Sequence, residues 1–168
     1  MPIFYIVLVI NPDETLNGFI RRNSIGVPVR KLHITLCSFS LTKENVALSI
    51  LHTFNELERI ISSFVIKTQD LVFVRDTNLL KVELNPCSSR KVNVVRDMVL
   101  NHFQKCSFLQ ALDMKCKPHI TLFREVSNKP FDEKLNVTKR ISHIEIIMWD
   151  NKKNETISSL NGHKIKLK

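Results

Sequence analysis

The sequence predicts an α+β fold built from two related lobes, in which antiparallel sheets carry helices on their outer faces and a central groove separates the lobes. Three observations lead to this prediction. The segment His-Ile-Thr-Leu occurs at 33–36 and again at 119–122. A long stretch with helical spacing of apolar residues follows the first copy, and another precedes the second. The remaining apolar segments are short and rich in β-branched residues, and helices packed on such sheets make an α+β domain.

The length and composition fit one domain spanning residues 1–168, because 168 residues with 43% hydrophobic content can bury a sizeable core. A net charge of +9 fits either an anionic partner or a surface charge that keeps the protein in solution. Since no RNA-binding motif with interleaved aromatic residues is present, we expect a small anionic nucleotide rather than a long RNA. The four cysteines lack zinc-site spacing, which favours reduced thiols in a cytoplasmic protein. We expect no membrane contact, because the apolar N-terminal run is too short to span a bilayer.

The N-terminal half is expected to alternate strands and helices. The apolar opening run stops at the breaker Asn11-Pro12, and a loop containing Gly26 leads into the strand of the first motif. Thr42 is the expected N-cap of a long helix whose apolar positions recur at helical spacing. In order, the expected elements are a strand Ile3–Ile10, a helix Asp13–Arg22, a strand Val29–Phe39 and a helix Lys43–Ser62.

The C-terminal half is expected to contain strands on either side of a second long helix. Turns are predicted at Gln69-Asp70 and at 76–78, Pro86 ends a strand, and Ser88 or Ser89 is expected to cap the helix. The expected strands are Phe64–Lys67, Leu71–Val74, Leu79–Leu84, Cys116–Glu125 with the second motif, Ile141–Met148, and a last one near Lys164–Lys168 after a turn at Gly162.

Each copy of the repeat places an imidazole beside a hydroxyl on one face of a strand. Alternate side chains point to opposite faces, so His33 shares a face with Thr35, and His119 shares one with Thr121. A single His-x-Thr on a strand is common and usually means only a polar face. Two copies, each with a lysine two residues before the histidine, indicate a paired imidazole site for acid–base cleavage of a phosphodiester.

Such a site needs no metal. An imidazole with an ordinary pKa of about 6.5 is available in both protonation states near neutral pH. One neutral histidine can accept a proton from an attacking hydroxyl while the other, protonated, donates to the leaving oxygen; the sequence leaves open which is which. The threonine hydroxyls can donate to the phosphate oxygens where negative charge accumulates. No cofactor is expected, because the chain offers no carboxylate cluster with metal-ligand spacing.

On these residues the chain resembles the two-histidine (2H, LigT-like) phosphoesterases, whose signature is a pair of H-x-[ST]-hydrophobic motifs on related lobes. His33, Thr35, His119 and Thr121 match that signature, and the Lys-Pro-His-Ile-Thr-Leu of 117–122 is typical of the second motif. The resemblance spans essentially the whole chain. It implies a bilobal α+β fold with the histidines facing each other in a groove, and metal-independent action on 2′,3′-cyclic phosphates, RNA ends or 2′,5′-linked nucleotides.

The residues that follow the first motif indicate which branch of the family the chain resembles. The segment Leu36-Cys37-Ser38-Phe39-Ser40 lacks the Phe-Leu-Gly that usually follows in the bacterial RNA ligase-like branch. This departure favours the branch with the central domain of kinase-anchoring proteins and the viral phosphodiesterases. It implies cleavage of 2′,5′ bonds in immune second messengers, 2′,3′-cGAMP or 2′,5′-oligoadenylate, by a viral antagonist acting in the host cytosol. The alternatives are a phosphodiesterase for 2′,3′-cyclic nucleotides or RNA ends, and a nucleotide-binding module without turnover.

Three aromatic residues are candidates for stacking on a base, an interaction that contributes roughly 1–3 kcal/mol. Tyr5 lies in the first predicted strand. Phe39 follows the first motif, and core packing is the stronger expectation for it. Trp149 stands at a strand end beside Asp150, which suits either exposed stacking or an interface with another protein.

Three cations near the motifs are candidates for phosphate binding. Lys31 and Lys117 share a strand face with the histidine two residues later, so they either add positive potential to the groove or lie in solvent. Arg124 follows Thr121 by three residues, and strict alternation places it on the opposite face. It can still reach a phosphate from the end of the strand.

Overall fold

The computed structural model describes residues 3–41, 47–104, 109–112, 116–127, 134–149 and 160–168. Within them every strand pairing is antiparallel. The elements in chain order are β1 (Ile3–Val9), α1 (Glu14–Arg22), β2 (Val27–Pro28), β3 (His33–Leu41), α2 (Ala47–Ile60), β4 (Phe64–Val74), β5 (Leu79–Leu84), α3 (Pro86–Phe103), β6 (Leu109–Leu112), β7 (His119–Arg124), β8 (Thr138–Ile141), β9 (His143–Trp149) and β10 (Lys164–Lys166).

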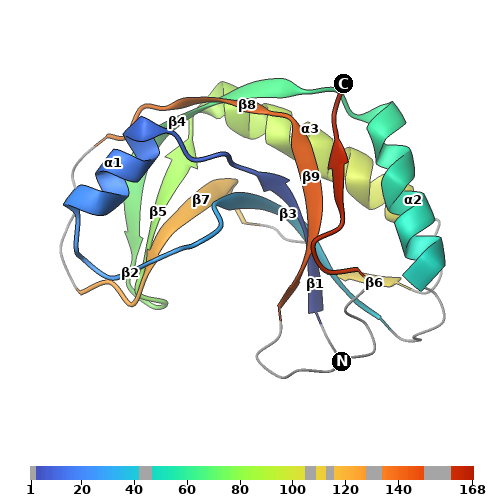
Figure 1. The fold of residues 1–168 in the computed structure, drawn as a ribbon, viewed down its shortest axis with the longest axis horizontal. Helices are drawn as coiled ribbons and strands as arrows, with labels where there is room; N and C mark the ends of the chain where they lie inside the picture. The colour runs from blue at the N-terminus through green and yellow to red at the C-terminus, as the bar shows by residue number, and fades with distance from the viewer. Residues whose placement is uncertain (1–2, 42–46, 105–108, 113–115, 128–133, 150–159) are drawn as a thin grey trace.

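The strands form two five-stranded sheets, which confirm the predicted α+β fold. Strand order is β10-β9-β1-β3-β6 in one sheet and β8-β4-β5-β7-β2 in the other. The motif strands β3 and β7 therefore occupy equivalent places, each second from one edge. They lie side by side where the sheets meet, and in Figure 1 the sheets spread from there as the two arms of an arch.

Helix α3 joins the two sheets from their outer side, because it packs against strands of both (Figure 1). It begins at Pro86, and the side chain of Asn85 accepts a hydrogen bond from the Ser88 backbone N–H at 2.8 Å. The predicted cap at Ser88 or Ser89 is wrong, since an Asn before a proline at the first helical position makes a better N-cap. Ser88 is buried and its Oγ accepts a hydrogen bond from the backbone N–H of Lys67.

The second sheet differs from the prediction in three strands: β2 and β8 were not expected, and β4 was expected as two separate strands. Phe64–Lys67 and Leu71–Val74 are one continuous strand, β4, and the expected turn at Gln69-Asp70 is a register shift between Thr68 and Leu71. An irregularity of this kind takes up extra residues without ending the strand. The first part of β4 pairs with β8 and the remainder with β5. The expected cap at Thr42 lies outside the described residues.

The core is continuous under both sheets and the helices. Phe39 is 2% exposed, and its ring stacks on Phe4 at 5.4 Å and on Phe103 at 6.2 Å between centroids. The predicted core role of Phe39 is therefore confirmed, and its ring is not available to a base. Across the described helices, none combines the length and apolarity needed to cross a membrane.

Each motif strand contains a β-bulge at the leucine of His-Ile-Thr-Leu. In β3, Thr35 lies opposite Val7 but Cys37 lies opposite Ile6, so Leu36 is an extra residue. In β7, Thr121 lies opposite Lys81 but Phe123 lies opposite Leu80, so Leu122 is the extra residue. An extra residue reverses the alternation beyond it. Both leucines and the residues after them are buried.

The two glycines before the first motif offer a test of how closely β2 packs on β7. A Cβ on Gly26 would lie 2.4 Å from the backbone oxygen of Arg124, so Gly26→Ala must push β2 away from β7. A Cβ on Gly18, in α1, would lie 3.1 Å from the mobile end of Arg22. We expect Gly26→Ala to destabilise the protein by about 1–3 kcal/mol and Gly18→Ala to be neutral or stabilising by up to about 1 kcal/mol, as measured by urea unfolding. Equal stability of the two variants would contradict this packing.

Candidate active site

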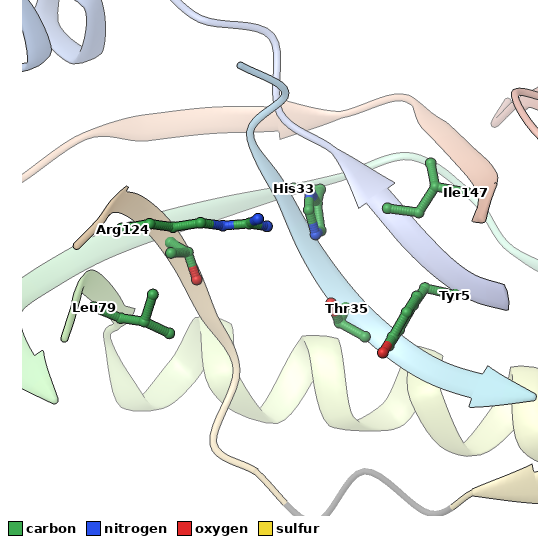
Figure 2. A pocket seen from close by; sticks show the side chains of 7 residues that line it. Tyr5, His33, Thr35, Leu79, Arg124 and Ile147 are labelled. Atoms are coloured by element: carbon green, nitrogen blue, oxygen red, sulfur yellow. The ribbon is translucent and has the colours of Figure 1, made fainter. Parts of the chain in front are cut away.

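The motif strands border a cleft of about 370 Å³ where the two sheets meet. His33 and Thr35 reach it from β3, and Thr121 reaches it from β7. Figure 2 shows His33, Thr35 and Arg124 directed toward the same space. His119 shares the face of Thr121, and it is close enough to His33 for the two charges to repel each other. The structure thus brings together the four residues of the repeated motif.

The two histidines are held in the same way. Nδ1 of His33 lies 2.9 Å from the carbonyl oxygen of Lys31, and Nδ1 of His119 lies 2.9 Å from that of Lys117. A carbonyl oxygen can only accept, so Nδ1 must carry the proton in both rings. Nε2 is then a proton acceptor when the ring is neutral and a donor when it is charged. Both imidazoles therefore offer the same reactive atom in the same orientation.

Each of these lysines is in turn paired with a glutamate on another strand of the same sheet. Lys31 forms an ion pair with Glu145 of β9, which is 2% exposed. Lys117 Nζ lies 2.6 Å from Glu83 of β5. Since Glu83 lies directly opposite His119 in the sheet register, its carboxylate is also beside that imidazole. The lysines predicted to bind substrate are thus already paired with carboxylates, and their backbone carbonyls orient the histidines.

Burial is the main reason why the pKa of His33 lies below its ordinary value. The nearby charges of Arg124 and Lys31 lower this pKa further, whereas the hydrogen bond to the Lys31 carbonyl and the charge of Glu145 raise it. Desolvation disfavours the charged ring, and neighbouring cations act in the same direction.

The pKa of His119 is also lowered, first by burial and then by the charges of Lys81 and His33. The hydrogen bond to the Lys117 carbonyl and the charge of Glu83 oppose this change. Burial raises the pKa of Glu83 itself, but Lys117 and Lys81 outweigh that effect and hold it below the usual value, so Glu83 remains a carboxylate. Because the charged imidazoles repel each other, the doubly protonated form is disfavoured.

Arg124 lines the cleft although strict alternation places it on the other face of β7. The bulge at Leu122 explains the difference, because the extra residue returns Arg124 to the face of His119 and Thr121. A guanidinium in this position can bind two oxygens of a phosphate. The bulge therefore places Arg124 at the cleft, whereas its binding of a phosphate stays a prediction.

The cleft continues into a second compartment of about 350 Å³, which shares His33, Arg124 and Ile147 with the first. The first compartment is bordered by Tyr5 and Leu79, as well as by the shared residues. The second is bordered by β2 and the segment that follows it, residues 27–31. The histidine and the arginine therefore stand between two spaces, each with apolar side chains on its border.

The remaining predicted residues fall into two groups. Tyr5 borders the cleft, whereas Trp149 pairs with Ile3 through its backbone and its side chain lies outside the described part. Sequence reasoning missed Ile147 and the two glutamates. Glu145 could have been predicted from the sequence, because a carboxylate in the middle of the apolar strand His143–Trp149 needs a buried partner.

Comparison with known proteins identifies the family and the fold. The family model described as AKAP7 2'5' RNA ligase-like domain matches residues 16–167. No curated protein matches the chain in sequence at a significant level.

Solved structures resemble the chain over nearly its full length. E. coli LigT complexed with NADP+ is 18% identical with a TM-score of 0.66, covering 99% of each chain. A structure described as a phosphoesterase is 16% identical with a TM-score of 0.68, covering 99% of this chain and 98% of the other. The MHV ns2 PDE domain is 7% identical with a TM-score of 0.66, covering 88% of this chain and 100% of the other. At these identities the structures support the shared fold.

The electrostatics of the two histidines can be measured without a substrate. We expect ¹⁵N–¹H spectra to show the Nδ1-protonated tautomer for neutral His33 and His119, and both to titrate below about pH 6.5. Glu83→Gln removes a charge that raises the pKa of His119, so that pKa should fall further while the pKa of His33 changes little. Exposed His52 provides an internal reference for folding. An unchanged or higher pKa of His119 in Glu83→Gln would contradict this arrangement.

Proposed function

The chain belongs to the AKAP7 2'5' RNA ligase-like domain family of the two-histidine phosphoesterases, and from that premise we propose that it cleaves the 2′,5′ bond of a small nucleotide without a metal. The substrates proposed are 2′,3′-cGAMP and 2′,5′-oligoadenylate. His33 and His119 are the acid–base pair, and Thr35 and Thr121 bind the phosphate.

The proposal rests on one observation: the same hydrogen bond to a lysine carbonyl fixes the imidazole in both motifs. In both copies a lysine carbonyl fixes Nδ1 at 2.9 Å, so that Nε2 of each ring is left for proton transfer. Efficient acid–base catalysis needs a group whose proton is exchangeable near the working pH and whose reactive atom is already oriented. A protein that only binds nucleotides has no use for two such groups.

A 2′,5′ bond suits this pair because the same ribose carries a free 3′-hydroxyl. One neutral imidazole accepts the proton of that hydroxyl as its oxygen attacks phosphorus. The bond from phosphorus to the 5′-oxygen then breaks, and the other, protonated imidazole donates its proton to the leaving oxygen. The product is a 2′,3′-cyclic phosphate. Thr35, Thr121 and Arg124 can donate to the non-bridging oxygens, where negative charge accumulates in the transition state.

The two compartments favour a substrate with a nucleoside on each side of the phosphate. They meet at His33 and Arg124, where the phosphodiester would lie. In the first, Tyr5 and Leu79 offer a surface for one base, and in the second, the segment 27–31 offers a surface for the other. A cyclic mononucleotide would fill only one of them. Solved structures of E. coli LigT contain NADP+, 3′-AMP or ATP, which supports a nucleotide as the class of ligand.

A substrate panel tests the function. The protein is incubated, with chelator present, with 2′,3′-cGAMP, 2′,5′-oligoadenylate, a 3′,3′-cyclic dinucleotide and 2′,3′-cyclic AMP. We expect the 2′,5′-containing compounds to be cleaved, and His33→Ala or His119→Ala to lower kcat by about 10²–10⁴-fold, the usual contribution of one acid–base group. His52→Ala, which alters an exposed histidine on α2, should keep full activity.

Each other outcome of this panel has a definite meaning. Activity lost in chelator, or retained in both motif variants, would refute the mechanism. Cleavage of 2′,3′-cyclic AMP alone would replace the proposed substrate with a cyclic nucleotide or an RNA end. Nucleotide binding without turnover of any compound would identify a binding module.

The pH profile provides a second test. One histidine must be neutral and the other charged, so kcat/KM should be bell-shaped. Because the pKa of each imidazole is lowered in the free protein, the maximum should lie below about pH 6.5. The bound phosphate stabilises the charged ring, so the kcat profile should lie at higher pH than the kcat/KM profile. A rate that rises steadily from pH 5 to 9, with chemistry shown to be the slow step, would contradict the paired mechanism.

A further inference from the structure

We propose that Arg96, buried in α3 behind the cleft, is a positioning residue that holds the two histidine strands in their working arrangement. This inference rests on the proposed function for its effect on turnover. The geometry on which it is based does not depend on the substrate.

One guanidinium binds the backbone of both motif segments. Nε of Arg96 donates to the carbonyl of Leu36 at 2.8 Å, and Nη2 donates to the carbonyl of Thr35 at 3.2 Å. Nη1 donates to the carbonyl of Cys116, just before β7, at 3.1 Å and to the side-chain oxygen of Asn93 at 3.1 Å. Three of these four bonds thus reach segments that carry the two motifs.

The contact in β3 is at the bulge. Leu36 is the extra residue of that strand, and a bulge locally disrupts the hydrogen-bond ladder. Arg96 supplies donors to carbonyls at this point, and a buried carbonyl without a donor is unfavourable. An arginine is suited to this task because its planar fork offers several donors at fixed angles, which a lysine does not.

Arg96 is an expensive residue to bury, which argues for a specific role. It is 7% exposed, and within the described part of the chain its hydrogen-bond partners are three backbone carbonyls and a side-chain amide rather than a carboxylate. An apolar side chain of similar length would fill the same space without the cost of desolvating a charge. It would leave the carbonyls of Thr35, Leu36 and Cys116 without these donors.

The need for such a link follows from the topology. β3 and β7 belong to different sheets, so no shared hydrogen-bond ladder fixes one against the other. The short β2, which precedes β3 in the chain, pairs with β7 near its end. Deeper in the fold, packing and the hydrogen bonds of Arg96 keep the two motif strands at the right separation. A displacement of about 1 Å at a reacting group can cost about 100-fold in rate.

The test compares Arg96→Met with Val95→Ala. Val95 is the preceding residue of α3 and is also 7% exposed, so its truncation weakens the packing of the same helix without touching the motif carbonyls. We expect Arg96→Met to lower kcat by about 10–100-fold with KM changed less than about threefold, since the groups that bind substrate remain. At a temperature where both variants are folded, Val95→Ala should keep most of its kcat.

Arg96→Lys is the second variant, because it keeps the charge and the helix but lacks the planar fork of donors that binds both segments. It should fold and show an intermediate kcat. Wild-type turnover in Arg96→Met or Arg96→Lys, or an equal loss of kcat in Val95→Ala, would overturn the proposal. So would failure of both arginine variants to fold, because Arg96 would then serve folding alone.

A measurement without turnover separates this inference from the proposed substrate. In Arg96→Met the imidazole NMR signals of His33 and His119 should shift, and their mutual effect on titration should change, while the signals of exposed His52 should not move. Binding of 3′-AMP should shift the imidazole NMR signals of both motif histidines together in the wild type. In Arg96→Met the shifts of the two signals should be only weakly correlated. An inactive wild type would refute the proposed function, whereas unchanged histidine signals in Arg96→Met would refute this inference.

Discussion

The arrangement of the cleft depends on one backbone constraint, the extra residue that each motif strand carries at the leucine of His-Ile-Thr-Leu. The bulges at Leu36 and Leu122 allow two consecutive residues to face the core. Beyond them the strand presents its opposite set of side chains to the groove. This is how Arg124 joins the side of the histidine and threonine that precede it. Without the bulge, Arg124 would point into the core, where an unpaired charge is strongly unfavourable.

The two halves of the cleft also share an arrangement of charges, a lysine–glutamate ion pair beside each histidine. Lys31 pairs with Glu145, and Lys117 pairs with Glu83, so each histidine has a lysine–glutamate pair nearby. Burial already lowers the pKa of both imidazoles. In a chain with a net charge of +9, unpaired cations at the cleft would lower these pKa values further. The glutamates limit that effect. They also hold the lysines whose carbonyls orient the rings, so one ion pair serves both the geometry and the protonation of its histidine.

The sequence was sufficient to predict the fold class, the paired motifs and the family, because all three depend on local patterns or on a repeated signature. It was not sufficient to predict the bulges, because Leu36 and Leu122 have the same composition as ordinary strand residues and become extra only against β1 and β5. The pair of Lys31 with Glu145 joins residues far apart in the chain, and it depends on the strand order, which the sequence does not specify. For the same reason Arg96 looked like an ordinary residue of a helix.

The two lobes are alike in plan but differ in the charges beside each histidine. The proposed reaction needs one neutral ring and one charged ring at the same time, and unequal neighbours decide which imidazole holds the proton more tightly. Glu83 lies on the strand next to His119, whereas Glu145 lies two strands away from His33. Arg124 acts on His33, while Lys81 acts on His119. The repeated motif supplies two equivalent groups, and their unequal neighbours give the two imidazoles different electrostatic surroundings, which the proposed opposite proton transfers would use.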